Sequence, residues 1–178
     1  YPWKEIPGSS HQVLLRLLET RGTGLRVLDL GFGAGLLARR IRPRCAYLAG
    51  IELDPEAARE GAPFFDTPIV GDLLQGLKGP WEQPFDVAVA GDILEHLPDP
   101  VRALVEIRQL LAPGGLLLVS LPNVANVTVR LALLAGRFGK AQTQVAGLAI
   151  IVRQTQGAAP YAQLPDAQPA GQRGDPAR

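Results

Sequence analysis

The sequence predicts an α/β protein in which a mostly parallel sheet carries helices on both faces. First, short apolar segments typical of strands alternate along the chain with segments that have a helical period. Second, glycines and acidic residues stand directly after the predicted strands. Third, the chain has 178 residues, of which 47% are hydrophobic and 20% charged, enough for one domain with a continuous core.

The first strand is expected at residues 26–30, after an amphipathic helix that ends near Arg21. The strand passes without a polar linker into a turn with glycines at alternate positions, 31, 33 and 35. A helix is expected to follow directly and to run to about Ile41, with its free N–H groups directed at the turn. Because glycine permits positive φ and close approach of a ligand, we expect this turn to hold a ligand.

The charge beside the turn indicates which ligand. Asp29 stands two residues before Gly31, and the glycine spacing is G-x-G-x-G, whereas the dinucleotide fingerprint is G-x-G-x-x-G. A carboxylate there would repel a pyrophosphate and attract an ammonium or sulfonium group. The alternative is a tight turn whose acid only caps a neighbouring segment.

Acidic residues also end the next two predicted strands. The second strand, 47–53, carries Glu52, which lies 21 residues beyond Gly31 and can accept hydrogen bonds from both hydroxyls of a ribose. Asp54 is better explained as the cap of the following helix, which ends near Gly61. The third strand ends in Asp72, which could contact a ligand or cap a helix.

The fourth strand, 85–90, leads into Gly91 and Asp92 at the edge where open α/β sheets bind ligands. The remaining elements are expected to be a helix from about 100 to 111, a strand at 116–121, a helix at 124–135 and a possible strand at 147–152. Of the 24 residues in 155–178, 17 are Ala, Gly, Pro or Gln. We therefore expect one domain over 1–154 and a disordered tail over 155–178.

The Asp-x-Gly-x-Gly-x-Gly turn resembles motif I of the class I S-adenosylmethionine-dependent methyltransferases. The resemblance covers about 1–138 and includes Glu52, Asp72, Phe85-Asp86, Glu95-His96-Leu97 and 111–115. Residues 120–123, 129–131 and 136–138 resemble a type 11/12-like subgroup near methionine biosynthesis protein W and glycan-associated methyltransferases. The resemblance stops beyond Phe138, so it implies a Rossmann-like three-layer sandwich with an atypical C-terminus, truncated relative to the seven-stranded family fold.

The resemblance implies S-adenosylmethionine as the cofactor and a methyl transfer to a small-molecule or saccharide acceptor. It also implies that Asp72 accepts a hydrogen bond from the adenine amino group and that the backbone of Leu73 completes this contact. The predicted cofactor-binding residues are Asp29, Gly31, Phe32, Gly33, Gly35, Glu52, Leu53, Asp72, Leu73, Gly91 and Asp92.

His96 is the candidate general base, because its imidazole follows the fourth strand; the alternative is a histidine that packs beneath the cofactor. Asp92, Glu95 and His96 would share one face of a helical turn and could hold a metal, but nothing nearby completes such a site, so we expect none. Two other functions stay open: a non-catalytic S-adenosylmethionine-binding protein, and an NAD-dependent oxidoreductase, which the turn spacing disfavours.

Composition bounds the partners and the location. The net charge is +1 with scattered basic residues, so we expect neither nucleic acid nor a membrane as a partner. Cys45 is the only cysteine, which excludes an internal disulfide, and no apolar run is long enough for a membrane span. We expect a soluble cytoplasmic protein. The sequence lacks Met even at position 1, which indicates a fragment or a processed chain.

Overall fold

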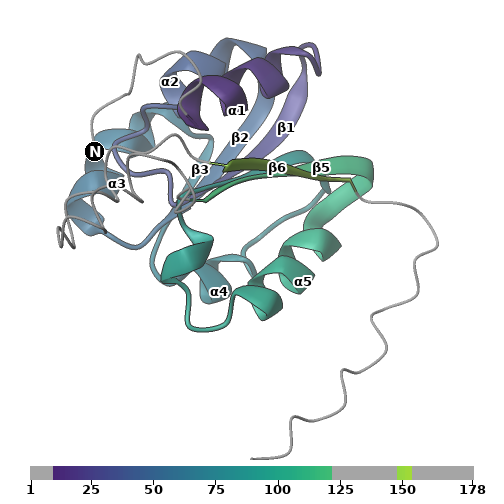
Figure 1. Cartoon of the computed structure of the whole chain (residues 1–178). Helices are drawn as coiled ribbons and strands as arrows, with labels where there is room; N and C mark the ends of the chain where they lie inside the picture. Colours follow the sequence, from purple (N-terminus) through teal and green to yellow (C-terminus); the bar gives the residue numbers. More distant parts are fainter. Residues whose placement is uncertain (1–9, 122–147, 154–178) are drawn as a thin grey trace, which may run out of the picture.

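The sheet has six strands in the order β3-β2-β1-β4-β5-β6 (Figure 1) in the computed structural model, which describes residues 10–121 and 148–153. The first five strands are parallel, and β6 is antiparallel to β5. This confirms the mostly parallel sheet predicted from the strand and helix alternation. The strands are β1 (Leu25–Leu30), β2 (Cys45–Glu52), β3 (Thr67–Val70), β4 (Phe85–Gly91), β5 (Leu111–Leu121) and β6 (Leu148–Arg153).

Helices cover both faces of the sheet, which gives the three layers expected (Figure 1). One face carries α1 (Ser10–Glu19), α2 (Ala38–Ile41) and α3 (Pro55–Gly61), and the other carries α4 (Leu73–Gly76) and α5 (Pro100–Leu110). The part of the chain that the structure describes also contains three short 3₁₀ helices: η1 (Arg42–Arg44), η2 (Ala62–Phe64) and η3 (Leu94–His96).

The central strands are apolar throughout because each face of the sheet is covered. Val27 and Val87 face the α1 side, whereas Leu28 and Ala88 face the α5 side, and all four are at most 1% exposed. Burying a side chain the size of Val or Leu contributes roughly 1.5–3 kcal/mol. The two core clusters therefore fix the sheet and the places where its strands end.

The segment after the glycine turn differs from the prediction. A helix was expected directly after Gly35, but α2 begins only at Ala38 and passes at Arg42 into η1, which contains Pro43. The turn glycines have positive φ, which an α-helix cannot include, and the ring of Pro43 stops its continuation. The turn therefore does not receive the N-terminus of a long helix.

The start of β5 is a second difference. We expected a helix through Leu111 and a strand only from Leu116, but α5 ends at Leu110 and β5 already begins at Leu111. Leu111 pairs with Phe85, and Leu116 with Val87, so the partner strand advances two residues while β5 advances five. The extra residues include Gly114, whose φ of 78° accommodates the irregularity.

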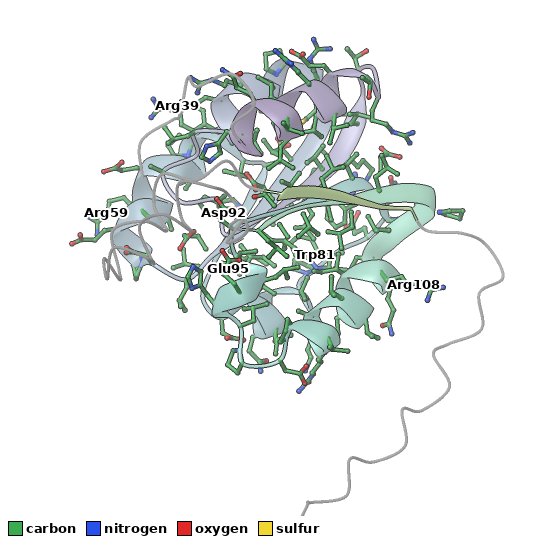
Figure 2. The ribbon with its side chains drawn as sticks, in the orientation of Figure 1. Arg39, Arg59, Trp81, Asp92, Glu95 and Arg108 are labelled. Carbon is green, nitrogen blue, oxygen red and sulfur yellow. The ribbon has the colours of Figure 1, made fainter. Side chains whose placement is uncertain are left out.

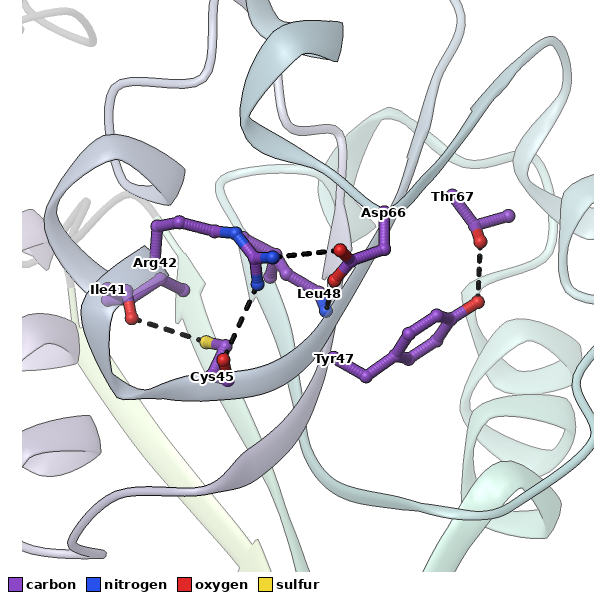
Figure 3. A network of polar contacts seen from close by, with 7 residues as sticks. All are labelled: Ile41, Arg42, Cys45, Tyr47, Leu48, Asp66 and Thr67. Carbon is purple, nitrogen blue, oxygen red and sulfur yellow. Dashed lines mark hydrogen bonds and ion pairs between the residues drawn. The ribbon is translucent and has the colours of Figure 1, made fainter.

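A polar network ties β2 to the segment before β3 at the N-terminal end of these strands (Figure 3). The Asp66 carboxylate accepts from Arg42 Nη2 and from the Leu48 backbone N–H, each at 2.8 Å, and the Asp66 N–H donates to the Leu48 carbonyl at 2.8 Å. Burial raises the pKa of the Cys45 thiol to about 11. This cysteine is therefore a packing residue at neutral pH.

The expected strand at 147–152 is confirmed as β6, Leu148–Arg153. The helix expected at 124–135, the tail at 155–178 and the resembling residues 122–138 lie outside the described residues. The predicted domain boundary after residue 154 stays a prediction.

Candidate cofactor site

The predicted site residues gather at the C-terminal edge of the parallel sheet. Asp29 lies on β1 and Glu52 on β2, while Asp72 follows β3 and Asp92 follows β4. In this sheet order the four strands are neighbours, so their C-terminal ends meet at one edge. Figure 2 shows Asp92 and Glu95 at this end of the molecule. Residues 29–37, 52–54, 70–73 and 90–95 contain no Lys or Arg.

The glycine turn is closed from below and open above. A Cβ at Gly31 would lie 2.8 Å from Ile93 Cδ1, and one at Gly35 would lie 2.9 Å from Phe64 Cδ2. Among the described residues, a Cβ at Gly33 would meet no atom within 4 Å, and the φ of Gly33 is 53°. Gly33 therefore borders open space, while the other two glycines are required by their neighbours.

The glycine turn also needs a glycine at position 61, which the sequence did not indicate. A Cβ there would lie 2.5 Å from the Gly33 carbonyl oxygen and 2.9 Å from the Gly35 nitrogen. The end of α3 thus packs on the backbone of the turn. The sequence indicated only that Gly61 ends a helix, because a contact between two segments leaves no local pattern.

Phe32 is directed into the core. Its side chain is 5% exposed, and its ring centroid lies 4.4 Å from that of Phe65. A Cβ at Gly50 would come within 2.5 Å of the Phe32 ring. Phe32 can therefore contact a ligand only through its backbone, and its side chain supports the turn from below.

Glu52 holds the turn with the same carboxylate that was predicted to bind a ribose. Its Oε2 accepts from the Gly33 N–H at 2.7 Å and its Oε1 from the Asp54 N–H at 2.8 Å. Each carboxylate oxygen has capacity for a second donor, and the side chain is half-buried. Glu52 can therefore fix the turn and still accept hydroxyl groups of a ligand.

Asp29 lies beneath this turn. It is 4% exposed, and among the described residues its Oδ2 is buried without a hydrogen-bond partner. Burial, and to a smaller extent the Glu52 carboxylate, raises the pKa of Asp29 from 3.8 to about 7. The Asp29 carboxyl group is thus only partly ionised at neutral pH, whereas the sequence led us to expect a fully ionised carboxylate. A cationic partner would supply the interaction that it lacks.

Of the predicted site residues after β2 and β3, two belong to α4 and its cap, and one is exposed on the surface. Asp72 caps α4 by accepting from the Gln75 N–H at 3.1 Å, the structural role left open by the sequence, and its predicted contact with adenine stays a prediction. Leu73 is buried as the first residue of α4, so its N–H has no partner within the helix. Leu53 is 69% exposed and offers apolar surface beside Glu52.

Gly91 and Asp92 end β4 against β5. Among the described residues, Asp92 is the one non-glycine residue with positive φ, 52°. The Ser120 hydroxyl donates to Asp92 Oδ1 at 2.8 Å and accepts from the Asp92 N–H at 3.0 Å. No local pattern in the sequence indicates a role for Ser120 in the site, because its contact joins residues 28 positions apart.

His96 lies at the end of η3 and is exposed, with 72% of its side chain accessible. Its Nε2 lies 4.0 Å from Glu95 Oε1. The shared helical turn proposed for Asp92, Glu95 and His96 is wrong, because Asp92 has positive φ and precedes a 3₁₀ helix. No group of three potential metal-binding side chains occurs within 10–121 and 148–153. The role of His96 as a base stays a prediction.

The site fits S-adenosylmethionine on three observations of this structure. Within residues 10–121 and 148–153, Asp29 Oδ2 is a buried acceptor without a partner, and the turn at Gly33 is open. Glu52 can in addition accept hydroxyl groups. The described segments at this edge contain six acidic residues and no Lys or Arg, which favours a cationic nucleoside over a ligand with phosphate groups. The fold and this edge are thus those of the class I S-adenosylmethionine-dependent methyltransferases.

The chain belongs to the family described as "Methyltransferase domain", whose model matches residues 3–151. A curated relative, ubiquinone biosynthesis O-methyltransferase of Xylella fastidiosa (strain 9a5c), is 32% identical over 123 residues. That alignment covers 65% of this chain and 49% of the relative, so the chain spans about half the length of the curated relatives it matches. The methionine biosynthesis W and glycan-associated subgroup stays a prediction.

Solved structures support the fold and the cofactor. N-methyltransferase NodS from Bradyrhizobium japonicum WM9 in complex with S-adenosylhomocysteine is 26% identical, with a TM-score of 0.59, and the match covers 83% of this chain and 74% of NodS. The [4+2]-cyclase SpnF is 28% identical with a TM-score of 0.51, over 61% of this chain and 44% of SpnF. Within the described residues, no helix has the length and apolar character to cross a membrane.

Proposed function

We propose that this chain transfers a methyl group from S-adenosylmethionine to an oxygen, nitrogen or carbon atom of a small-molecule acceptor. The observation that carries the proposal is the buried Asp29 Oδ2, which has no hydrogen-bond partner in the described residues and lies beneath an open glycine turn. A buried polar atom without a partner costs about 1–3 kcal/mol, so the arrangement is explained by a ligand that completes it.

Each acidic residue at the edge has a distinct proposed role. Asp29 attracts the cationic part of the cofactor, and Glu52 accepts the ribose hydroxyl groups while it holds Gly33 in place. Asp72 and the backbone of Leu73 contact the adenine. The exposed side chain of Leu53 provides an apolar surface for the same ring.

When bound, S-adenosylmethionine supplies an electrophilic methyl group on a sulfonium sulfur. The protein's contribution is to hold both reactants in line, an effect able to supply about 7–11 kcal/mol. His96 is the proposed acceptor of the proton that the nucleophile loses, because its imidazole is exposed at the edge of the site. We infer a small molecule or a saccharide as the acceptor, and a cytoplasmic location.

Calorimetry with S-adenosylhomocysteine and with NAD tests the cofactor. We expect binding of the first and none of the second, and loss of binding in Asp29→Ala and Glu52→Ala. Binding of NAD alone would contradict the proposal. Glu82→Gln is the matched control, because Glu82 is exposed on the loop before β4.

The second candidate is a cofactor-binding protein without methyl transfer. It is favoured by one observation: SpnF, a structure with a similar fold, is described as a [4+2]-cyclase and not as a methyltransferase. Transfer of a radiolabelled methyl group to fractionated metabolites separates the two candidates. Labelled product in a saccharide fraction would support the proposed acceptor. Binding of S-adenosylhomocysteine without labelled product in any fraction would favour the second candidate.

A further inference from the structure

The tip of β4 holds Asp92 in a backbone conformation that L-residues rarely adopt, with φ of 52°. Glycine would occupy this position without strain, and glycine already occupies the neighbouring position 91. A residue kept in a strained conformation points to a role for its side chain. Here that side chain is a carboxylate at the edge of the proposed cofactor site.

Ser120 fixes this carboxylate. Ser120 is 1% exposed at the end of β5, and its hydroxyl donates to Asp92 Oδ1 at 2.8 Å. The same oxygen accepts from the Asp92 N–H at 3.0 Å, and the Ser120 carbonyl accepts from that N–H at 3.1 Å. Three hydrogen bonds with the buried Ser120 thus fix both the backbone N–H and the carboxylate of Asp92.

The strand order indicates which part of a ligand Asp92 would meet. Glu52 on β2 and Asp72 after β3 lie on one side of β1. Asp92, which follows β4, and Ser120 on β5 lie on the other side. The ribose and adenine are proposed to lie on the β2 and β3 side. The amino-acid half of the cofactor would then extend over β1 toward β4.

We propose that Ser120 is a positioning residue whose hydroxyl fixes the Asp92 carboxylate to receive the ammonium group in the amino-acid half of the cofactor. The inference rests on the proposed function. One hydrogen bond from Ser120 leaves acceptor capacity on the carboxylate for the ammonium group. Because the hydrogen bond from Ser120 already fixes the Asp92 side chain, binding of the ammonium group costs less side-chain entropy.

The test compares two probes by calorimetry: S-adenosylhomocysteine, and 5′-methylthioadenosine, which lacks the amino-acid half. We expect Ser120→Ala to weaken binding of S-adenosylhomocysteine by about tenfold and to leave that of methylthioadenosine within about twofold. Ser120→Cys keeps a weak donor, the S–H group, on a slightly larger side chain, so its affinity should lie between those of wild type and Ser120→Ala. Should Ser120→Ala fail to fold, the Cys variant still provides the comparison.

A second background separates positioning from a general structural role. Asp92→Gly removes the carboxylate and accepts the positive φ without strain. In this background Ser120→Ala should leave the affinity for S-adenosylhomocysteine unchanged, because the partner through which it acts is gone. An equal loss in both backgrounds would assign Ser120 a structural role and overturn the inference.

Two outcomes separate the failure of this inference from the failure of the proposed function. An unchanged affinity of Ser120→Ala and Ser120→Cys for S-adenosylhomocysteine, or an equal loss for both probes, would overturn the inference while the proposed function stands. Failure of the wild-type chain to bind S-adenosylhomocysteine would overturn the proposed function itself.

Discussion

The Oε2 atom of Glu52 accepts a hydrogen bond from the backbone N–H of Gly33 across 2.7 Å. This bond joins the end of β2 to the middle glycine of the turn that follows β1. The side chain predicted to bind the cofactor therefore also shapes the loop on which the cofactor would lie. Substitution of Glu52 should affect both roles.

Glu52→Gln should weaken binding of S-adenosylhomocysteine by about tenfold or more, because a neutral amide accepts more weakly than a carboxylate and only one of its two termini can accept. Calorimetry measures the change. The control is Glu82→Gln, on an exposed loop residue, which should bind as wild type does. An unchanged affinity in Glu52→Gln would contradict the assigned role.

Asp29→Asn should stabilise the cofactor-free protein at pH 8 while it weakens cofactor binding. Burial raises the folded-state pKa from 3.8 to about 7, so the folded state binds the proton more tightly than the unfolded state. The contribution of Asp29 to stability is therefore highest below about pH 4, falls as the pH rises to 7, and stays low above it. This range corresponds to up to about 4 kcal/mol. Urea unfolding of both proteins at pH 4 and pH 8 measures it, and an equal difference at both pH values would contradict the prediction.

The affinity for S-adenosylhomocysteine should rise with pH between 6 and 8. The ammonium group has three N–H donors, so it can interact with Asp29 as well as with Asp92, and its positive charge favours the ionised form of Asp29. The pKa of Asp29 of about 7 therefore makes binding below that pH release a proton. The expected gain is up to about tenfold. Calorimetry in two buffers with different ionisation enthalpies detects the released proton, and Asp29→Asn should show no such pH dependence.

Gly61→Ala tests the contact between α3 and the turn. Alanine is intrinsically the better helix former by about 1 kcal/mol, but its Cβ would lie 2.5 Å from the Gly33 carbonyl oxygen. Because the atom it meets is backbone, we expect the steric cost to dominate, at about 1–3 kcal/mol, together with weaker cofactor binding. Thermal unfolding and calorimetry measure both effects. Glu60→Ala, on the exposed neighbour in α3, is the control, and a stabilised Gly61→Ala would show that the turn can move away.

Asp66→Ala should separate stability from binding. The network of Arg42, Leu48 and Asp66 in Figure 3 lies at the N-terminal end of β2, opposite the cofactor edge. Loss of the carboxylate leaves the Leu48 N–H without this acceptor and should cost about 1–3 kcal/mol by urea unfolding. The affinity of the folded protein for S-adenosylhomocysteine should stay unchanged, and a weaker affinity would show that the two ends of β2 are coupled.

Several parts of the fold followed from local pattern. Apolar runs predicted the parallel strands, Asp54 before Pro55 predicted the start of α3, and the alternation of elements predicted the three layers, all of which the structure confirms. The helix after the turn was placed too early, since periodicity shows apolar residues but not the positive φ of the preceding glycines.

The sequence by itself determined the order of the elements and the chemistry of the edge, because strand ends, glycines and acids are local features of the chain. Only the tertiary structure decided how these residues act on one another. Burial in the packed sheet raises the pKa of Asp29. The hydrogen bonds from Gly33 to Glu52 and from Ser120 to Asp92 each connect one strand to the segment that follows another. Such contacts depend on strand order and register, which long-range packing fixes and no local spacing encodes.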